Sequence, residues 1–290
     1  MKVELAKSAG FCFGVNRAME LVEKQIALGK SEPIYTYGPL IHNEEVVASL
    51  EKKGVHVCES NAEDKCPIVN ENGGRGTMIL RSHGVSANTE KHLKNLGFDI
   101  VDATCPFVKR IHKTVNEESK AGKHIIIVGN AKHPEVEGII GWCNEPPFVI
   151  ENIDEADRIP YAKDEKVCIV SQTTFNSKKF KEIVDYITKK GYDINVVNTI
   201  CNATEERQQA AGELAEAADC MIVIGGTHSS NSRKLYEICA QRCENTHFIQ
   251  TLDDLHLELP KSVRLVGITA GASTPNNIIE EVQNYVRNEF

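Results

Sequence analysis

The 290-residue chain has no long block of lysine or arginine, and its formal net charge is −8 at pH 7. Non-specific binding to nucleic acid or to an acidic membrane surface requires a basic footprint, so this charge balance argues against both functions. A small anionic ligand is not excluded, because backbone amides and neutral side-chain donors can bind it locally.

Long apolar runs are absent too. No apolar stretch approaches the ~20 residues that a membrane-spanning helix requires. Lys2, Glu4 and Lys7 interrupt the segment before Cys12, which therefore lacks the apolar core of a secretory signal. We expect a cytoplasmic protein whose ten cysteines are mostly buried small hydrophobes, metal ligands or catalytic groups.

Three of these cysteines are spaced almost evenly, because Cys12, Cys105 and Cys201 lie 93 and 96 residues apart. Each stands where a strand-like run gives way to a helix-like run. Two further features follow each cysteine in the same order. The first is an apolar run, a glycine and a polar turn with a histidine: His42, His133 and His228. The second is another strand-like run with a polar end: Met78–His83, Val167–Thr173 and Leu265–Ser273.

This repeat is too long for a solenoid and indicates three copies of a small α/β unit. Strand-like and helix-like runs alternate, which predicts largely parallel sheets. We place the boundaries near Ala103 and Thr199. The predicted units are residues 1–103, 104–199 and 200–290, with the N-terminal strand as an alternative member of the third unit.

Apolar residues at helical spacing predict helices over Leu21–Leu28, Phe180–Ile187 and Ile278–Val286. Proline is tolerated at the first helical position, so Pro106, Pro134 and Pro275 are each expected at a helix start. The glycine-rich segment from Asn61 to Gly76 is expected to form an exposed loop or hairpin.

The evenly spaced cysteines suggest a shared metal site. Iron–sulfur clusters are usually held by four thiolates at recognisable local spacings, and none of those spacings occurs here. Three dispersed cysteines at helix starts could instead meet on a pseudo-threefold axis, where helix amino termini favour anionic thiolates. Three ligands for four irons would leave one iron open. The alternative, three ordinary buried cysteines, does not account for their repeated context.

Other cysteines are better explained by packing. Cys168 and Cys220 lie in or beside apolar strands, and Cys143 follows Trp142. Cys239 and Cys243 are expected to share a helix face at i, i+4; a zinc site there is an alternative, but it lacks an obvious second pair of ligands.

Several polar residues follow strands and predict an anion site, since parallel α/β folds bind ligands at the carboxyl ends of their strands. They are His42, His83, His133, Ser229, Ser230 and Asn231. A lone histidine is more often a satisfied structural residue, but three in related positions favour binding. The serines could simply cap the next helix, and capping does not exclude phosphate binding.

Glu135 is a candidate proton donor. It follows His133-Pro134 at the start of an expected helix, where the helix dipole alone favours an acid. If it reaches the site, it could deliver a proton to a substrate. Thr173, at the end of a later strand, could orient the same group or be one more strand-end hydroxyl.

Taken together, these segments resemble the motifs of one family, the 4-hydroxy-3-methylbut-2-enyl diphosphate reductases of the LytB/IspH type, over essentially the whole chain. The matching segments, in family order, are Gly10-Phe11-Cys12, Gly38-Pro39-Leu40-Ile41-His42-Asn43, His83-Gly84-Val85-Ser86, Asp102-Ala103-Thr104-Cys105-Pro106, His133-Pro134-Glu135-Val136, Ser171-Gln172-Thr173-Thr174, Ser229-Ser230-Asn231-Ser232 and Thr269-Ala270-Gly271-Ala272-Ser273. Departures are small: Phe13 stands where alanine is common, and Arg81-Ser82 where smaller apolar or hydroxyl residues are expected.

The resemblance implies an α/β trefoil of three pseudo-threefold-related α/β/α domains around one [4Fe–4S] cluster with one open iron. It implies Cys12, Cys105 and Cys201 as metal ligands, and Glu135, with Thr173 and His133, as the proton-supplying residues. The implied substrate-binding residues are His42, His83, His133, Thr173, Ser229, Ser230, Asn231 and Ser273.

The implied reaction is a two-electron reductive dehydroxylation that yields isopentenyl and dimethylallyl diphosphate, the last step of the non-mevalonate isoprenoid pathway. The implied protein is a monomer served by an external one-electron donor such as ferredoxin or flavodoxin, without nucleic acid or membrane. Two other classes stay open. A redox-neutral iron–sulfur lyase or dehydratase would need no reductant, and a cluster-based sensor would need neither the diphosphate donors nor Glu135.

Overall fold

The computed structural model describes residues 1–29, 31–58 and 76–290. The expected loop or hairpin over Asn61 to Gly76 lies outside this part of the chain, apart from Gly76 itself. Within the described residues the strands form three four-stranded sheets, and every strand pair is parallel. The prediction of an α/β protein with parallel sheets is therefore confirmed.

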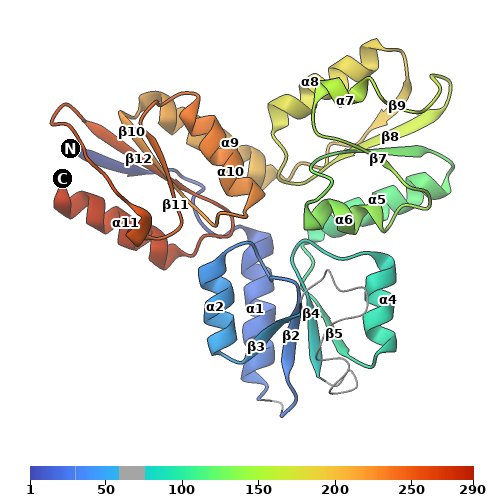
Figure 1. Cartoon of the computed structure of the whole chain (residues 1–290), viewed down its shortest axis with the longest axis horizontal. Coiled ribbons are helices and arrows are strands. Elements are labelled where there is room, and N and C mark those ends of the chain that lie inside the picture. Colours follow the sequence, from blue (N-terminus) through green and yellow to red (C-terminus); the bar gives the residue numbers. More distant parts are fainter. Residues whose placement is uncertain (30, 59–75) are drawn as a thin grey trace. The chain divides into compact units, whose positions relative to one another are not determined.

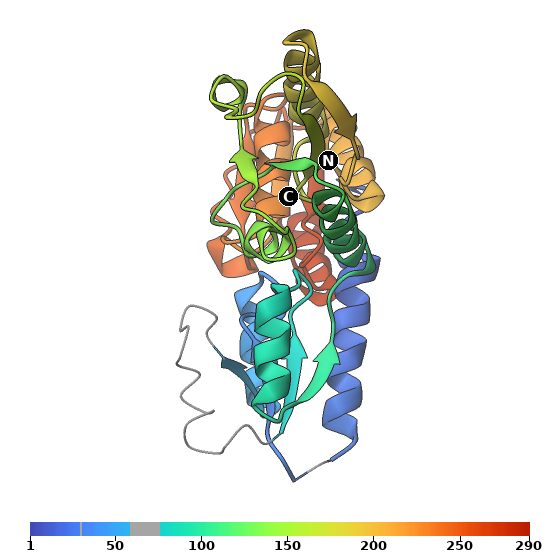
Figure 2. The ribbon, with the colours of Figure 1, turned by 90° about the vertical axis from the view of Figure 1, so that its right-hand side faces the viewer.

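The first sheet has the order β3-β2-β4-β5. Its strands are β2 (Ile34–Tyr37), β3 (Val55–Cys58), β4 (Thr77–Leu80) and β5 (Asp99–Asp102). The neighbouring helices are α1 (Phe13–Ala27), α2 (Glu44–Lys52) and α4 (Ala87–Asn95). Figure 2 shows α4 and α1 on opposite sides of β4 and β5.

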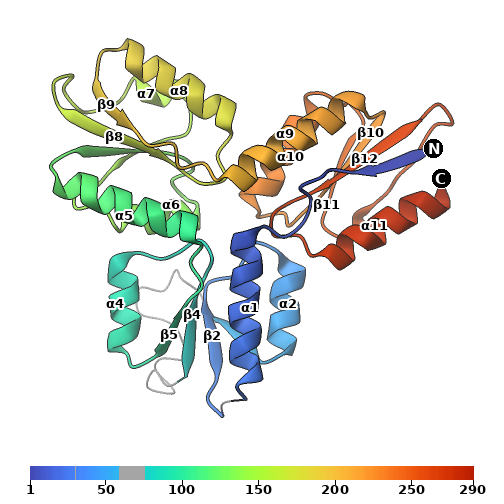
Figure 3. The same ribbon diagram turned by 180° about the vertical axis from the view of Figure 1, so that it is seen from behind.

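The second sheet has the order β7-β6-β8-β9. Its strands are β6 (His124–Val128), β7 (Phe148–Ile150), β8 (Lys166–Ser171) and β9 (Asp193–Val196). Its helices are α5 (Pro106–Lys120), α6 (Pro134–Ile140), α7 (Ile153–Ala156) and α8 (Ser177–Lys189). Ile126 packs with Ile183 of α8 in one core, and Ile127 packs with Ile111 of α5 in the other. Both faces are thus covered, as Figure 3 shows.

The third sheet has the order β1-β12-β10-β11. Its strands are β1 (Lys2–Leu5), β10 (Cys220–Ile224), β11 (Thr246–Ile249) and β12 (Leu265–Ala270). The helices are α9 (Asn202–Ala217), α10 (Ser230–Ala240), the short 3₁₀ helix η1 (Leu252–Asp254) and α11 (Asn276–Glu289). Figure 1 shows α9 and α10 on one face and α11 on the other. Met221 accordingly packs with Leu214 of α9, and Ile222 with Val282 of α11.

The chain forms two compact units. One comprises residues 1–15, 42–46 and 201–290 and contains the third sheet, including β1; the other comprises residues 16–41 and 47–200 and contains the first two sheets. The boundaries near Ala103 and Thr199 stay a prediction. No helix in the described ranges is long and apolar enough to cross a membrane.

The expected helix starts are present. Pro106 and Pro134 are the first residues of α5 and α6, and Pro275 is the N-cap of α11. One expectation is wrong: Cys239 and Cys243 do not share a helix, because α10 ends at Ala240. Both are nonetheless buried in the core formed by α9, α10 and β10, and burial raises the pKa of Cys239 to about 12. This supports packing rather than metal binding.

Candidate active site

The described residues contain a buried carboxyl group, Glu135, in the first turn of α6. Its side chain is held by one residue from the end of β8. The Thr173 backbone N–H donates to Glu135 Oε1 and the Thr173 hydroxyl donates to Oε2, both at 2.6 Å. His133, the N-cap of α6, accepts the backbone N–H of Glu135 through Nδ1 at 3.1 Å. The three residues predicted to supply protons therefore do come together.

Burial decides the protonation state of Glu135. It raises the pKa of this carboxyl to about 7, although the two hydrogen bonds from Thr173 lower it. Desolvation is the larger of the two effects, so the pKa lies above the ordinary value of a glutamate carboxyl group. Near neutral pH a substantial fraction of Glu135 is consequently protonated, as a general acid requires.

His83 lies beside His133, with ring centroids 5.5 Å apart and planes at 76°. The turn after β4 that carries His83 is fixed by its neighbours. Arg81 Nε donates to Gly84 O at 3.3 Å, and a Cβ at Gly84 would lie 2.6 Å from Cε1 of His112. Gly84 also has φ +74°, which favours glycine. These contacts hold the turn in which His83 lies beside His133, the N-cap of the helix that carries Glu135.

Further predicted substrate-binding residues gather in the unit that contains the third sheet. The Ser273 hydroxyl donates to His42 O at 2.9 Å. The His42 carbonyl also lies against Gly226, where an added Cβ would be only 2.6 Å from that oxygen. The segment after β12 and the turn after β10 therefore both contact the segment that contains His42.

The Ser229-Ser230-Asn231 segment begins α10. Ser229 is the N-cap, and its Oγ accepts the backbone N–H of Ser232 at 3.3 Å, so the capping interpretation is correct. Capping does not use Asn231. Its side chain is 5% exposed, and neither amide atom has a hydrogen-bond partner in the described structure. Leaving a buried amide unpaired costs about 1–3 kcal/mol, so this group is suited to a ligand.

The repeated histidine position is only partly correct. His133 caps α6, but the equivalent cap of α10 is Ser229, and His228 before it is 77% exposed and 3.9 Å from Glu44. In the first repeat the capping contact is made by Asn43, whose Oδ1 accepts the Val46 N–H at 3.1 Å. The feature that the three repeats share is therefore the N-capping residue of the following helix, not the histidine.

The three predicted metal ligands have a common local setting. Cys12 directly precedes α1, and Cys105 and Cys201 are the N-caps of α5 and α9. Neither N-cap cysteine uses its side chain to cap its helix. All three thiols are partly exposed and outside disulfides, whereas Cys168 and Cys220 are buried and have a raised pKa. Such a donor set fits an iron–sulfur cluster.

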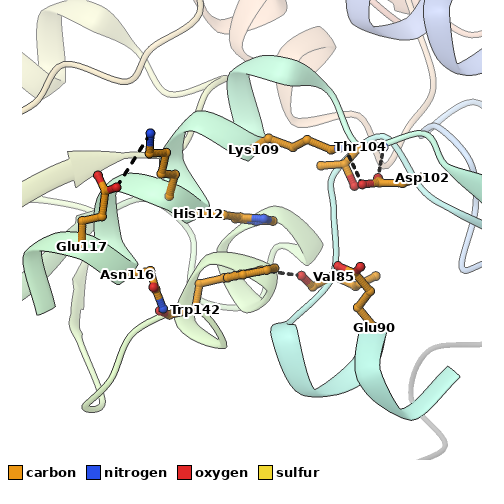
Figure 4. A pocket seen from close by; sticks show the side chains of 10 residues that line it. Val85, Glu90, Asp102, Thr104, Lys109, His112, Asn116, Glu117 and Trp142 are labelled. Carbon is orange, nitrogen blue, oxygen red and sulfur yellow. Dashed lines mark hydrogen bonds and ion pairs between the residues drawn. The ribbon is translucent and has the colours of Figure 1, made fainter. Parts of the chain in front are cut away.

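A cavity of about 350 Å³ lies beside the segment before Cys105 (Figure 4). Its wall includes Thr104 and His112; the His112 imidazole stacks on Trp142 with centroids 5.2 Å apart. Burial lowers the pKa of His112 to about 4, so this ring is neutral at pH 7. The Trp142 indole N–H donates to Val85 O at 2.9 Å, which links the end of α6 to the turn of His83.

Sequence reasoning missed Arg207, which is 4% exposed in α9. Its Nη2 donates to Gly10 O at 2.7 Å, two residues before Cys12. In the sequence, Arg207 is only an arginine in the predicted helix that follows the candidate ligand Cys201. Arginines in helices are usually exposed, so the sequence does not predict that this one is buried.

Parallel α/β sheets with a buried carboxyl group beside strand-end histidine and hydroxyl side chains are the features of an α/β enzyme. The chain belongs to the LytB protein family, whose profile matches residues 3–287.

Relatives agree over the full length. The 4-hydroxy-3-methylbut-2-enyl diphosphate reductase of Thermoanaerobacter sp. (strain X514) is 45% identical over 99% of this chain and 97% of its own. The enzyme of the same description from Clostridioides difficile (strain 630) is 44% identical over 99% of this chain and 100% of its own.

Two solved structures are also similar. The E-1-hydroxy-2-methyl-but-2-enyl-4-diphosphate reductase from Plasmodium falciparum matches with a TM-score of 0.90 at 30% identity, over 99% of this chain and 88% of that one. A structure described as (E)-4-hydroxy-3-methyl-but-2-enyl diphosphate reductase, the terminal enzyme of the non-mevalonate pathway, matches with a TM-score of 0.68 at 39% identity over 99% of both chains.

Proposed function

We propose that this chain is a 4-hydroxy-3-methylbut-2-enyl diphosphate reductase. The allylic alcohol takes up two electrons and two protons, its C–O bond breaks, water leaves, and isopentenyl or dimethylallyl diphosphate forms. Full-length similarity to reductases of that description supports the substrate class. The observation that carries the chemistry is the buried Glu135, because breaking the C–O bond with loss of water requires a proton at the oxygen.

Cys12, Cys105 and Cys201 would hold a [4Fe–4S] cluster, leaving one iron without a protein ligand. When bound, such a cluster supplies the electrons one at a time and a Lewis-acidic iron for the departing oxygen. Their partial exposure and their positions at helix starts support this assignment. The external electron donor is proposed to be a small one-electron carrier protein such as ferredoxin or flavodoxin.

Glu135 is the proposed proton donor to the leaving hydroxyl. Thr173 fixes both carboxyl oxygens, so the group has one orientation and needs no rearrangement before it acts. His133 holds the Glu135 backbone and keeps the start of α6 in place. Thr173 and His133 thus act on the proton through Glu135, and both are also proposed to contact the substrate.

The proposed substrate-binding residues carry imidazole, hydroxyl and amide groups, with no lysine or arginine among them. They are His42, His83, His133, Thr173, Ser229, Ser230, Asn231 and Ser273, of which the histidines, serines and asparagine are proposed to hold the diphosphate. The unpaired amide of Asn231 and the start of α10 are suited to an anion, because backbone N–H groups at a helix amino terminus point toward it. A monomeric, cytoplasmic enzyme is the accompanying expectation.

The test is an anaerobic assay of the purified protein with the hydroxylated diphosphate and reduced methyl viologen. We expect oxidation of viologen in step with formation of the two diphosphate products, two electrons for each molecule. Turnover without viologen would instead identify a redox-neutral lyase. A cluster in the visible and electron paramagnetic resonance spectra without any turnover would identify a sensor.

A further inference from the structure

Arg207 is a buried cation without a carboxylate partner. Its side chain is 4% exposed, and no ion pair in the described part of the chain includes it. Nη2 donates to Gly10 O at 2.7 Å and Nη1 donates to Ala203 O at 3.2 Å. Nε is buried and has no hydrogen-bond partner among the residues that the structure describes.

Such a group is costly unless negative charge offsets it. A guanidinium stays protonated in proteins, and burying an unpaired charge is unfavourable. Two carbonyl oxygens solvate the Arg207 guanidinium but do not neutralise it. A nearby anion would therefore stabilise Arg207 in the interior.

The charged neighbours of Arg207 identify that anion. Burial lowers the pKa of Arg207, and the charges that act against this are, in order, those of Cys12, Cys201 and Glu206. Glu206 is exposed, so solvent screens it. Cys12 and Cys201 are therefore the groups placed to offset Arg207 once they bind a metal cluster as thiolates.

Local geometry keeps Arg207 in this position. It lies on α9, six residues beyond the N-cap Cys201, and it holds the chain two residues before Cys12. Gly10 presents its carbonyl from φ +92°, and a Cβ there would lie 2.8 Å from Oδ1 of Asn276. One side chain thus joins the segments of two candidate ligands that are 189 residues apart.

We propose that Arg207 is the internal countercation of the cluster and a positioning residue for its ligands Cys12 and Cys201. This inference rests on the proposed function. Three thiolates give an oxidised [4Fe–4S]²⁺ centre a net charge of −1, and reduction by one electron makes it −2. A fixed cation stabilises the reduced form more, and net charge and hydrogen bonding are known determinants of cluster potentials. Arg207 would therefore raise the reduction potential and retard iron loss.

The test compares three variants of the anaerobically reconstituted holoenzyme. Arg207→Gln removes the charge and keeps a hydrogen-bonding side chain, whereas Arg207→Lys keeps the charge. Arg264→Gln is the matched control, since it removes one positive charge from a side chain of the same unit that is 89% exposed. The readouts are the midpoint potential, iron per chain, and the rate of iron release to a chelator.

We expect Arg207→Gln to lower the one-electron equilibrium constant for reduction at least tenfold, which corresponds to about 59 mV. Iron release should also be faster. Arg207→Lys should shift the potential less, and Arg264→Gln should match the unmodified protein. Equal potentials and equal iron release in Arg207→Gln and the unmodified holoenzyme would overturn this inference while leaving the proposed function intact.

Two other outcomes are decisive as well. An unmodified protein that holds no cluster after reconstitution contradicts the proposed function itself. If Arg207→Gln cannot hold the cluster, Arg207→Lys decides: retention of the cluster supports a requirement for charge. If Arg207→Lys loses the cluster as completely as Arg207→Gln does, the shape of the side chain rather than its charge is required. That result overturns the inference.

Discussion

At the scale of single residues, the environment of Glu135 distinguishes a proton donor from an acid that only stabilises the start of a helix. An acid in the first turn of a helix is ordinarily explained by the helix dipole and remains solvated and ionised. Here the side chain is 1% exposed and both of its oxygens accept hydrogen bonds from Thr173. Burial raises its pKa to about 7, so the carboxyl group is suited to holding a proton near neutral pH, as the proposed role requires.

The pH dependence of turnover follows from this pKa. The acid form is present below about pH 7 and is lost as the pH rises through that value, so kcat should fall on the alkaline side. Because the folded pKa lies above the ordinary value of 4.5, any stability contributed by the protonated group is lost as the pH rises from 4.5 to about 7.

Thr173→Val tests the origin of that alkaline limb. It removes the hydroxyl hydrogen bond that lowers the Glu135 pKa, so the limb should move to higher pH even if kcat falls. Thr173→Ser keeps the hydroxyl and should leave the limb near its original position. The measurement is kcat against pH with reduced viologen at saturating substrate. An unshifted limb in Thr173→Val would show that another group controls it.

At the scale of elements, the junctions between strands and helices carry most of the candidate site. After β2, β6 and β10 the chain reaches a capping residue, Asn43, His133 or Ser229, and each accepts a backbone N–H of the helix that follows. The same backbone geometry thus recurs with three different side chains. Fold and chemistry can diverge between repeats because the cap requires only an acceptor.

Close backbone approach at one of these junctions gives a further prediction. In Gly226→Ala, the new Cβ would lie 2.6 Å from the His42 carbonyl oxygen, which belongs to the backbone and cannot rotate away. We expect about 1–3 kcal/mol of destabilisation and a higher KM for the diphosphate, because the His42 segment must move.

The control is Gly138→Ala in α6, where an added Cβ meets nothing closer than 3.6 Å. It should be neutral or slightly stabilising, since alanine favours a helix. Denaturant unfolding and steady-state kinetics of the two variants give the comparison. Equal stability and equal KM in both would mean that the His42 backbone yields freely and does not position the substrate.

At the scale of the whole molecule, the sequence predicts the class of fold because the repeat and the alternation of apolar runs are local patterns. Three parallel sheets follow from them. The positions of the functional residues within the repeats are harder to predict from local patterns. His228 occupies the repeated histidine position yet is exposed, and Cys243 lies beyond the helix it was expected to share with Cys239.

Arg207 was not predicted for a different reason. Its partner carbonyl belongs to Gly10, which is 197 positions away, and no local pattern reports that contact. The same holds for the bond between Thr173 and Glu135, which are separated by 38 positions. Resemblance to a family can identify such residues. Their burial, their hydrogen-bond partners and the resulting protonation can be determined only from the three-dimensional structure.

The central claim is that Glu135 supplies the proton for a reductive loss of water. Its most direct test is the turnover of Glu135→Gln relative to the unmodified enzyme, measured anaerobically with reduced methyl viologen on samples of matched iron content and matched cluster spectrum. Glutamine preserves size and can still accept the Thr173 backbone N–H through its amide oxygen, but it cannot donate an acid proton. General acid catalysis typically contributes 10²–10⁴-fold, so we predict that kcat falls by about that factor while the cluster is retained. Full turnover by the iron-loaded variant would contradict the account.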